Sequence, residues 1–202
     1  MTETSTPAQS VVGKIPTIYL RDFDTHLLTD QVSPGCDWVF AREGVATRKF
    51  DGTCTMLDSQ GHWWARREVK PDREPPLNFW FVSKDLLTGK RVGWEPIGQS
   101  AWAKQHADAL EHDESLWEEV VVLEGEFTDV GTYELCGPKV NGNPEQLDHH
   151  QLIKHGTTMV AMSALSPIEL VRRMAGEGWE GIVWHHPDGR MAKLKARDLR
   201  GR

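Results

Sequence analysis

The stretch VATRKFDGTCTML, residues 45–57, decides how the chain is expected to fold. Its two ends, 45–47 and Thr53–Leu57, are rich in β-branched and apolar residues, as strands are. Between them stands Lys49-Phe50-Asp51-Gly52, a lysine at a strand end followed by an acidic residue and the glycine of a tight turn. We therefore expect two strands joined by a short loop that follows the lysine.

Outward from this loop, strand patterns dominate. Runs of apolar residues separated by turn residues such as Asp58-Ser59-Gln60-Gly61 and Pro187-Asp188-Gly189 predict three antiparallel pairs. The predicted pairs are Thr53–Leu57 with Trp63–Val69, 117–127 (with its apolar run 120–123) with 132–136, and Gly181–His185 with Met191–Lys195.

Helices are predicted at few places. Ser166-Pro167-Ile168-Glu169 has the Ser-x-x-Glu spacing of a capping box with proline at the first helical position, and a helix should run from there to 176–178. Another helix is predicted at 100–110, and the Pro- and Gly-rich stretches 71–76 and 137–144 are predicted loops. The predicted fold class is α+β, antiparallel sheets with few helices: a flexible N-terminal tail at 1–12, then a single domain at 13–202.

Composition excludes several classes of protein. The 202 residues are 39% hydrophobic and 26% charged with a mean hydropathy of −0.50, values of an ordinary globular chain without an apolar run that could cross a bilayer. The polar N-terminus lacks a signal-peptide pattern, so we expect a cytoplasmic protein with no membrane partner. Three widely spaced cysteines, Cys36, Cys54 and Cys136, are expected to be reduced, buried thiols.

Charge is unevenly distributed along the chain. The net charge of −7 argues against wholesale nonspecific binding of nucleic acid. Residues 104–126 hold eight carboxylates against one lysine, whereas residues 190–202 hold six basic side chains against one aspartate. A polyanion is therefore expected to approach the basic side. The candidate track for an RNA backbone is Arg66, Arg67, Lys70, Arg73 and the basic C-terminus, with an ordinary solvated basic face as the alternative.

Residues downstream give weight to the Lys-x-Asp-Gly motif. Glu134 lies in the predicted strand YELCG, Glu180 opens EGIVW, and Lys193 and Lys195 alternate along the last strand so that both face one side. Taken singly, each has a plain alternative, either a solvated strand glutamate or an ordinary charged edge strand. Only the joint pattern favours a site.

In this order the motifs resemble those of the covalent nucleotidyltransferases, the superfamily of ATP-dependent DNA and RNA ligases and mRNA capping enzymes. Residues 49–52 match the nucleophile motif, Arg66 the next basic motif, Glu134 the third, and 180–184 and 193–195 the fourth and fifth. The stretches ATRKFDGTC, WARREVKP, NGNP, LIKHG and EGIVWHHPDG look closest to the small single-domain 5′-to-3′ RNA ligases of the vertebrate type. The resemblance implies a ligase-type adenylyltransferase (ATP-grasp-like) domain.

The resemblance also implies roles. Lys49 would attack ATP to form a lysyl-AMP, and catalysis would rest on Lys49, Glu180, Lys193 and Lys195. The nucleotide would be bound by Lys49, Asp51, Gly52, Arg66, Glu134, His155, Lys193 and Lys195. Mg²⁺, or Mn²⁺, would be held through its waters by Asp51, Glu134 and Glu180. AMP would then pass to the 5′-phosphate of an RNA end, which a 3′-hydroxyl would attack to seal the strand.

The chemistry places a demand on the nucleophile. A lysine amine must be unprotonated to attack phosphorus, yet the ordinary lysine pKa is ~10.4. We expect positive charge from Lys193, Lys195 and the metal ion to lower the pKa of Lys49.

Several alternatives stay open. Only seven residues follow Lys195, so no OB-fold domain is expected there, which favours a compact RNA ligase over the DNA ligases and capping enzymes. The other hypotheses for the function are an auto-adenylylating nucleotide-dependent RNA-end sensor, a DNA-strand ligase and a noncatalytic binding module. The sequence does not fix the RNA joined, the choice of ATP over GTP, an adenine-stacking residue or the oligomeric state.

Overall fold

A computed structural model describes residues 13–86, 88–112, 122–123, 126–127, 130–161 and 164–199. They form two compact units, the first built from Asp51–His155 and the second from Lys14–Phe50 and the residues from 156 onward. The chain thus leaves the second unit directly after Phe50 and re-enters it after His155. The predicted tail at 1–12 lies outside the described residues, and the single domain at 13–202 stays a prediction.

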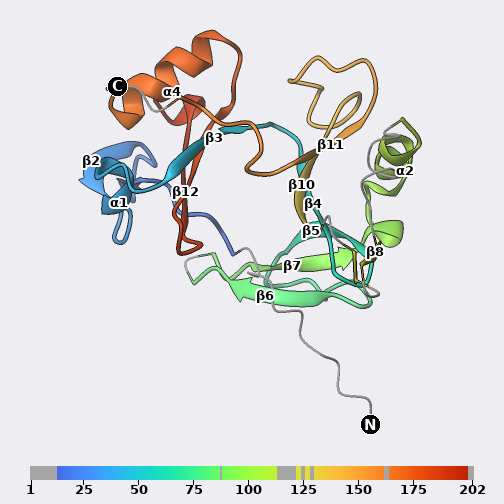
Figure 1. Ribbon diagram of the computed structural model, residues 1–202. Helices are drawn as coiled ribbons and strands as arrows, with labels where there is room; N and C mark the ends of the chain where they lie inside the picture. The colour runs from blue at the N-terminus through green and yellow to red at the C-terminus, as the bar shows by residue number, and fades with distance from the viewer. Residues whose placement is uncertain are drawn as a thin grey trace. The chain divides into compact units, whose positions relative to one another are not determined.

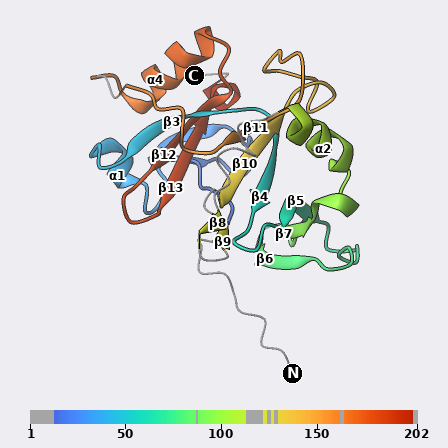
Figure 2. The same ribbon diagram turned by 45° about the vertical axis from the view of Figure 1, so that its right-hand side comes forward.

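The first unit is built on an antiparallel sheet in the order β11-β10-β4-β5-β7-β6 (Figure 1). One face of this sheet packs against α2 (Ala103–His112), which lies beside β10 and β11 (Figure 2). Tyr133, Leu135 and Leu152 from the sheet and Ala109 from the helix are buried in that core. The strands are β4 (Thr53–Leu57), β5 (Trp63–Val69), β6 (Trp80–Lys84), β7 (Arg91–Pro96), β10 (Gly131–Cys136) and β11 (Gln151–Lys154). Smaller elements of this unit are η1 (Ile97–Gln99) and the pair β8 (Val122–Leu123) and β9 (Glu126–Phe127).

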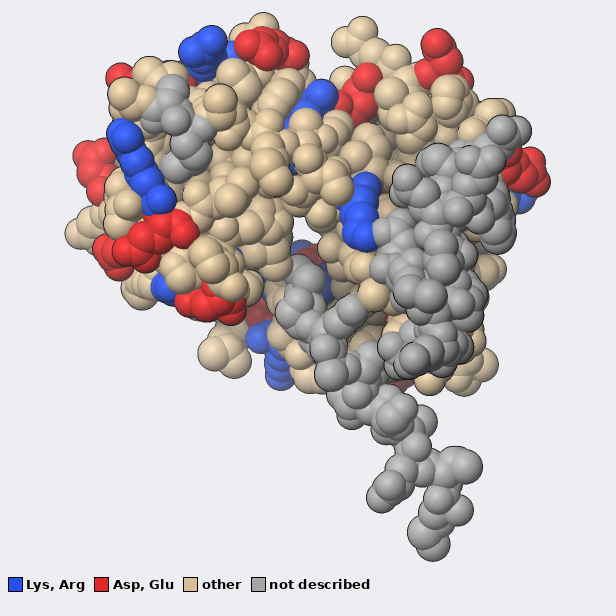
Figure 3. All heavy atoms as spheres, in the orientation of Figure 1, with Lys and Arg blue, Asp and Glu red and all other residues tan. Residues whose placement is uncertain are grey.

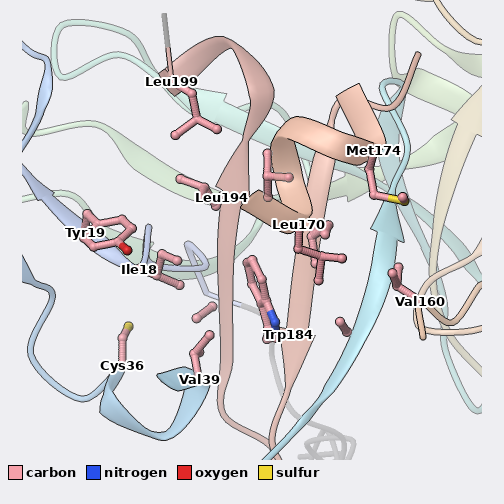
Figure 4. Packing of buried hydrophobic residues seen from close by; sticks show 14 of the residues in the cluster. Ile18, Tyr19, Cys36, Val39, Val160, Leu170, Met174, Trp184, Leu194 and Leu199 are labelled. Carbon is pink, nitrogen blue, oxygen red and sulfur yellow. The ribbon is translucent and has the colours of Figure 1, made fainter. Parts of the chain in front are cut away.

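The second unit is built on a three-stranded sheet in the order β13-β12-β3. Its strands are β3 (Val45–Lys49), β12 (Gly181–His185) and β13 (Met191–Lys195). The core lies between one face of this sheet, with Trp184 and Leu194, and α4 (Pro167–Gly176), with Leu170 and Met174 (Figure 4). Since side chains alternate along a strand, the opposite face carries a separate set of side chains, which includes Lys49, Lys193 and Lys195. The unit is completed by β1 (Tyr19–Arg21), β2 (Leu28–Val32), α1 (Asp37–Phe40) and η2 (Ala196–Leu199).

Most of the predicted elements are confirmed. The hairpins β4–β5 and β12–β13 form as expected, and the fold is α+β with antiparallel sheets and few helices. The helix expected at 100–110 begins at Ala103 and ends at His112. The capping box is present, because Ser166 Oγ accepts from the Glu169 N–H while the Glu169 carboxylate accepts from the Ser166 N–H. Among the described helices, none has the length and apolar character that crossing a bilayer requires.

One predicted strand pair is wrong. The run 132–136, within β10, pairs with β4 and β11 and not with 117–127. The last four residues of β10 are all buried, so this strand lies inside the sheet and has a partner on each side. Within 117–127, the described β8 and β9 pair with each other, and 117–121 lie outside the described residues.

The cysteines are free thiols. Cys36 and Cys136 are buried as expected, whereas Cys54 is only half-buried.

Candidate functional site

Three predicted site lysines share one face of the second unit's sheet. In the register of this sheet, Gly181 lies opposite both Lys49 on one side and Lys195 on the other. Directly opposed residues point to the same face, so the two lysines flank the glycine, and Lys193 lies on that face too. A Cβ at position 181 would lie 2.2 Å from the carbonyl oxygen of Leu194. A glycine is therefore required between the two lysines.

Glu180 binds two of these lysines. Its Oε2 lies 2.6 Å from Nζ of Lys49, and its Oε1 accepts a hydrogen bond from Nζ of Lys195. The Glu180 side chain is 8% exposed and each lysine side chain 18%, so the three groups form a largely buried ion-paired cluster. Burial acts to raise the pKa of Glu180, but Lys49 and Lys195 outweigh it and hold the pKa below its ordinary value. The carboxylate is thus ionised, and a solvated glutamate is the wrong interpretation for Glu180.

Lys193 differs from its neighbours because its pKa is lowered to about 8. Burial is the largest cause, followed by the positive charges of Lys195 and Lys49, with Lys14 contributing less and Glu180 acting in the opposite direction. The predicted nucleophile, Lys49, faces a carboxylate rather than lysines alone. Lys49 is thus ion-paired with Glu180, and Lys193 and Lys195 lie near it as expected.

Replacing Lys193 with methionine is expected to stabilise the protein at neutral pH. Below pH 8 the folded state carries the cost of a buried charge, and this cost is relieved as pH rises from the folded pKa of about 8 towards the unfolded value of 10.5. Lys193→Met should raise the free energy of unfolding by about 1–2 kcal/mol at pH 7, and the gap to wild type should shrink by about pH 9.5. Urea unfolding at both pH values measures this.

Lys84 is exposed, so Lys84→Met is the matched control, and it should change the free energy of unfolding little at either pH. A Lys193→Met protein that is less stable than wild type at pH 7, or a gap that persists unchanged at high pH, contradicts the prediction.

In the first unit, the structure brings Glu134 and His155 together. Oε2 of Glu134 lies 2.8 Å from Nε2 of His155, whose Nδ1 lies 2.9 Å from the hydroxyl of Thr132. Oε1 of Glu134 accepts a hydrogen bond from the Gly52 N–H at 3.0 Å. Glu134 is only 7% exposed, so the interpretation as a solvated strand residue is wrong here too. A Cβ on Gly52 would lie 2.2 Å from the carbonyl oxygen of Leu135, and glycine is what allows the turn to approach β10 this closely.

Two residues that the sequence did not assign hold the same turn. Glu145 accepts a hydrogen bond from the Asp51 N–H at 2.9 Å. The amide Nδ2 of Asn141 donates to the Gly52 carbonyl at 2.7 Å and to Oδ1 of Asp51 at 3.2 Å. Asn141 belongs to the stretch NGNP, which supported the family resemblance without receiving a role.

Arg66 lies on the same face of the first unit's sheet as Glu134, two strands away. Glu134 is opposite Cys54 on β4, and Arg66 follows Ala65, the partner of Thr55, so both point away from the α2 side. The Arg66 guanidinium lies 5.1 Å from the ring centroid of Trp94, and its burial lowers its pKa. Arg66 is therefore held against an aromatic surface on the Glu134 face.

The predicted RNA track is interrupted by acidic partners. Arg67 pairs with Glu95 at 3.7 Å, and Arg190 pairs with Asp188 at 2.8 Å. On the face drawn in Figure 3, the basic side chains of the second unit are interspersed with acidic ones. Much of the acidic stretch 104–126 lies outside the described residues. The RNA track stays a prediction.

A closed metal site is not seen among the residues that the structure describes, since no three His, Cys, Asp or Glu side chains gather into one. Of the predicted ligands, Asp51 and Glu134 belong to the first unit and Glu180 to the second. Magnesium in nucleotide sites is usually held by one or two carboxylates together with substrate phosphates and water. The hard carboxylate oxygens of these residues suit that ion, and the metal assignment stays a prediction.

Comparison with known proteins points to RNA ligases. No family model matches the chain. Proteins named RNA ligase 1 from Pongo abelii and Mus musculus are each 26% identical to it, and that from Rattus norvegicus is 27% identical. These matches cover 77% of this chain and 67%, 66% and 67% of the respective relatives. The chain is thus similar to RNA ligases over most of its length and spans about two thirds of theirs.

Proposed function

We propose that this protein is an ATP-dependent RNA ligase that joins 5′-phosphate and 3′-hydroxyl RNA ends through a lysyl-AMP and an RNA-adenylate. The observation that carries the proposal is the cluster of Lys49, Glu180 and Lys195, because these residues come from three separate sequence motifs and meet at one carboxylate. The similarity to proteins named RNA ligase 1 supports a ligase reaction on RNA.

In the first step, Nζ of Lys49 attacks the α-phosphorus of ATP. Lys49 reacts as the neutral amine: a P–N bond forms, the P–O bond to pyrophosphate breaks, and the nitrogen releases one proton to solvent. Before the reaction, the ion pair with Glu180 holds Nζ of Lys49 in position. Lys193 and Lys195 supply positive charge next to it, which favours the negatively charged phosphates and the charge that develops on the leaving group.

In the second step, an oxygen of the RNA 5′-phosphate attacks the same phosphorus. The P–N bond breaks, Lys49 takes up a proton, and AMP is now joined to the 5′-phosphate. In the third step, the 3′-hydroxyl oxygen attacks the 5′-phosphorus and loses its proton, and AMP leaves. One phosphodiester bond is made for each ATP converted to AMP and pyrophosphate.

Mg²⁺, or Mn²⁺, is the proposed metal, with Asp51, Glu134 and Glu180 as the proposed ligands through bound water. When bound, the ion would neutralise phosphate charge. Glu134 and Glu180 are buried carboxylates held in fixed positions by their hydrogen-bonding partners, as such a role requires.

The proposal is tested by intact mass and by strand joining. Incubation with ATP and Mg²⁺ should add the mass of one AMP, and pyrophosphate should remove it. Nicked or single-stranded RNA with 5′-phosphate and 3′-hydroxyl ends should then yield a longer strand on a denaturing gel. An adduct without joined RNA would favour the sensor, and joining of DNA alone a DNA-strand ligase. The absence of an adduct with either ATP or GTP overturns the proposal.

A further inference from the structure

We propose that Asn141 and Glu145 are positioning residues, which hold the turn after Lys49 in the conformation that self-adenylation needs. This inference rests on the proposed function. It assigns to the loop 137–147 a role in the reaction that rests on the hydrogen bonds of these two side chains to the turn.

The turn is held by side chains from elsewhere in the chain. Asp51 and Gly52 have four backbone N–H and C=O groups, and three of them bond to the side chains of Glu145, Glu134 and Asn141. These partners are more than 80 residues away in the sequence. The conformation of the turn is therefore set by the side chains that bind it and not by the turn itself.

One peptide group connects Glu145 to the nucleophile. The N–H of Asp51 and the C=O of Phe50 belong to the same peptide, which is planar and rigid. Glu145 accepts from the N–H of this group, while Nζ of Lys49 donates to its C=O at 3.2 Å. Fixing the N–H thus fixes the direction of the carbonyl that contacts the reactive amine.

The loop that supplies these side chains is itself well anchored. Asn143 bonds to the backbone of Leu147 with both its amide nitrogen and its amide oxygen. Val140 is fully buried in the core of the first unit. At the start of the loop, the Pro138 carbonyl contacts Nε2 of His150, whose Nδ1 contacts Asp108 of α2. A loop fixed at several points can hold another segment in register.

Misplacing a reacting atom by about 1 Å can cost about 100-fold in rate. Asn141→Asp keeps the size of the side chain, removes both N–H donors, and sets a carboxylate against the Gly52 carbonyl and the Asp51 carboxylate. Glu145→Ala removes the acceptor for the Asp51 N–H. Both variants are expected to form lysyl-AMP about 10- to 100-fold more slowly at saturating ATP, with a smaller change in the ATP concentration that gives half the maximal rate.

The experiment is a single-turnover measurement of AMP adduct formation, with a thermal melt of each protein. Glu145→Gln is the rescue variant, because its amide oxygen still accepts from the Asp51 N–H, and it should react at close to the wild-type rate. Two variants serve as charge-matched controls. Gln146→Glu adds a negative charge, as Asn141→Asp does, and Asp148→Asn removes a negative charge, as Glu145→Gln does. Both of these exposed controls should react normally.

Each outcome decides the question. The positioning role is contradicted, and the proposed function stands, if Asn141→Asp and Glu145→Ala form the adduct as fast as wild type does. The positioning role is also contradicted if Glu145→Gln is as slow as Glu145→Ala, or if rates fall only as far as the melts predict from loss of folded protein. Absence of any adduct on wild type overturns the proposed function, and with it the positioning role.

Discussion

Lys49→Arg is expected to abolish formation of the AMP adduct and to leave the protein folded. A guanidinium has a pKa above about 12 and does not lose its proton at usable pH, so it cannot attack phosphorus. It keeps its positive charge and can still pair with Glu180, whose carboxylate lies 2.6 Å from the native amine. The intact mass after incubation with ATP and Mg²⁺ should therefore show no AMP, while the thermal melt stays near that of wild type.

Two further variants sharpen this test. Lys84→Arg changes an exposed lysine on β6 in the same way and should form the adduct normally. Lys193→Arg addresses the competing amine, because burial and the neighbouring lysines lower the pKa of Lys193 to about 8. An adduct that persists in Lys49→Arg and disappears in Lys193→Arg would move the nucleophile to Lys193. Peptide mapping of the AMP-bearing fragment would then identify the residue directly.

The elements that sequence patterns predicted are those determined by neighbouring residues. The capping box needs only Ser166 to Glu169, and the β12–β13 hairpin needs only two alternating runs and the turn between them. The strand β7 had no such pattern. It is buried on both faces and includes a buried Glu95, so apolar and polar residues do not alternate along it. The short strand β1 has one buried residue out of three, too few to show a period.

The candidate site, like the fold, could be predicted from the sequence only in part. Motif order could identify Lys49, Glu180 and Lys195 as belonging together, but their common ion pair depends on the register that sets Gly181 opposite both lysines. This register depends on how three strands pair, and β3 lies more than 100 residues before β12 in the chain. Asn141 lay in the stretch NGNP but received no role, and Glu145 gave no signal, because a side chain that bonds to a distant backbone group leaves no spacing or periodicity in the sequence.

Glu180→Gln is expected to weaken both folding and adenylation. Glutamine has nearly the same size as glutamate, so the change removes charge while keeping shape. It leaves Lys49 and Lys195 largely buried without their shared carboxylate, and breaking such a pair costs about 3 kcal/mol of unfolding free energy. A view of Glu180 as a purely metal-facing group would predict lost adenylation without this loss of stability. Urea unfolding of the two proteins at pH 7 separates the two views.

The dependence of this loss on pH gives a second, independent measure. Because the pKa of Glu180 is lower in the folded protein than in the unfolded chain, its contribution is complete above the unfolded value of 4.5 and disappears as pH falls through the folded value. The stability gap between wild type and Glu180→Gln should thus be constant near neutral pH and shrink in acid. Exposed Glu74→Gln should show no such gap.

Adenylation of Glu180→Gln is best measured at a temperature where both proteins are folded, so that a slower rate reports on the site. The amide cannot hold the Lys49 amine as an ion pair, and the three lysines then repel one another without a compensating charge. We expect the amine to lose its fixed position and the adduct to form at least about 100-fold more slowly. A Glu180→Gln protein that is as stable as wild type and labels at the same rate would mean that the ion-paired cluster has no part in the reaction.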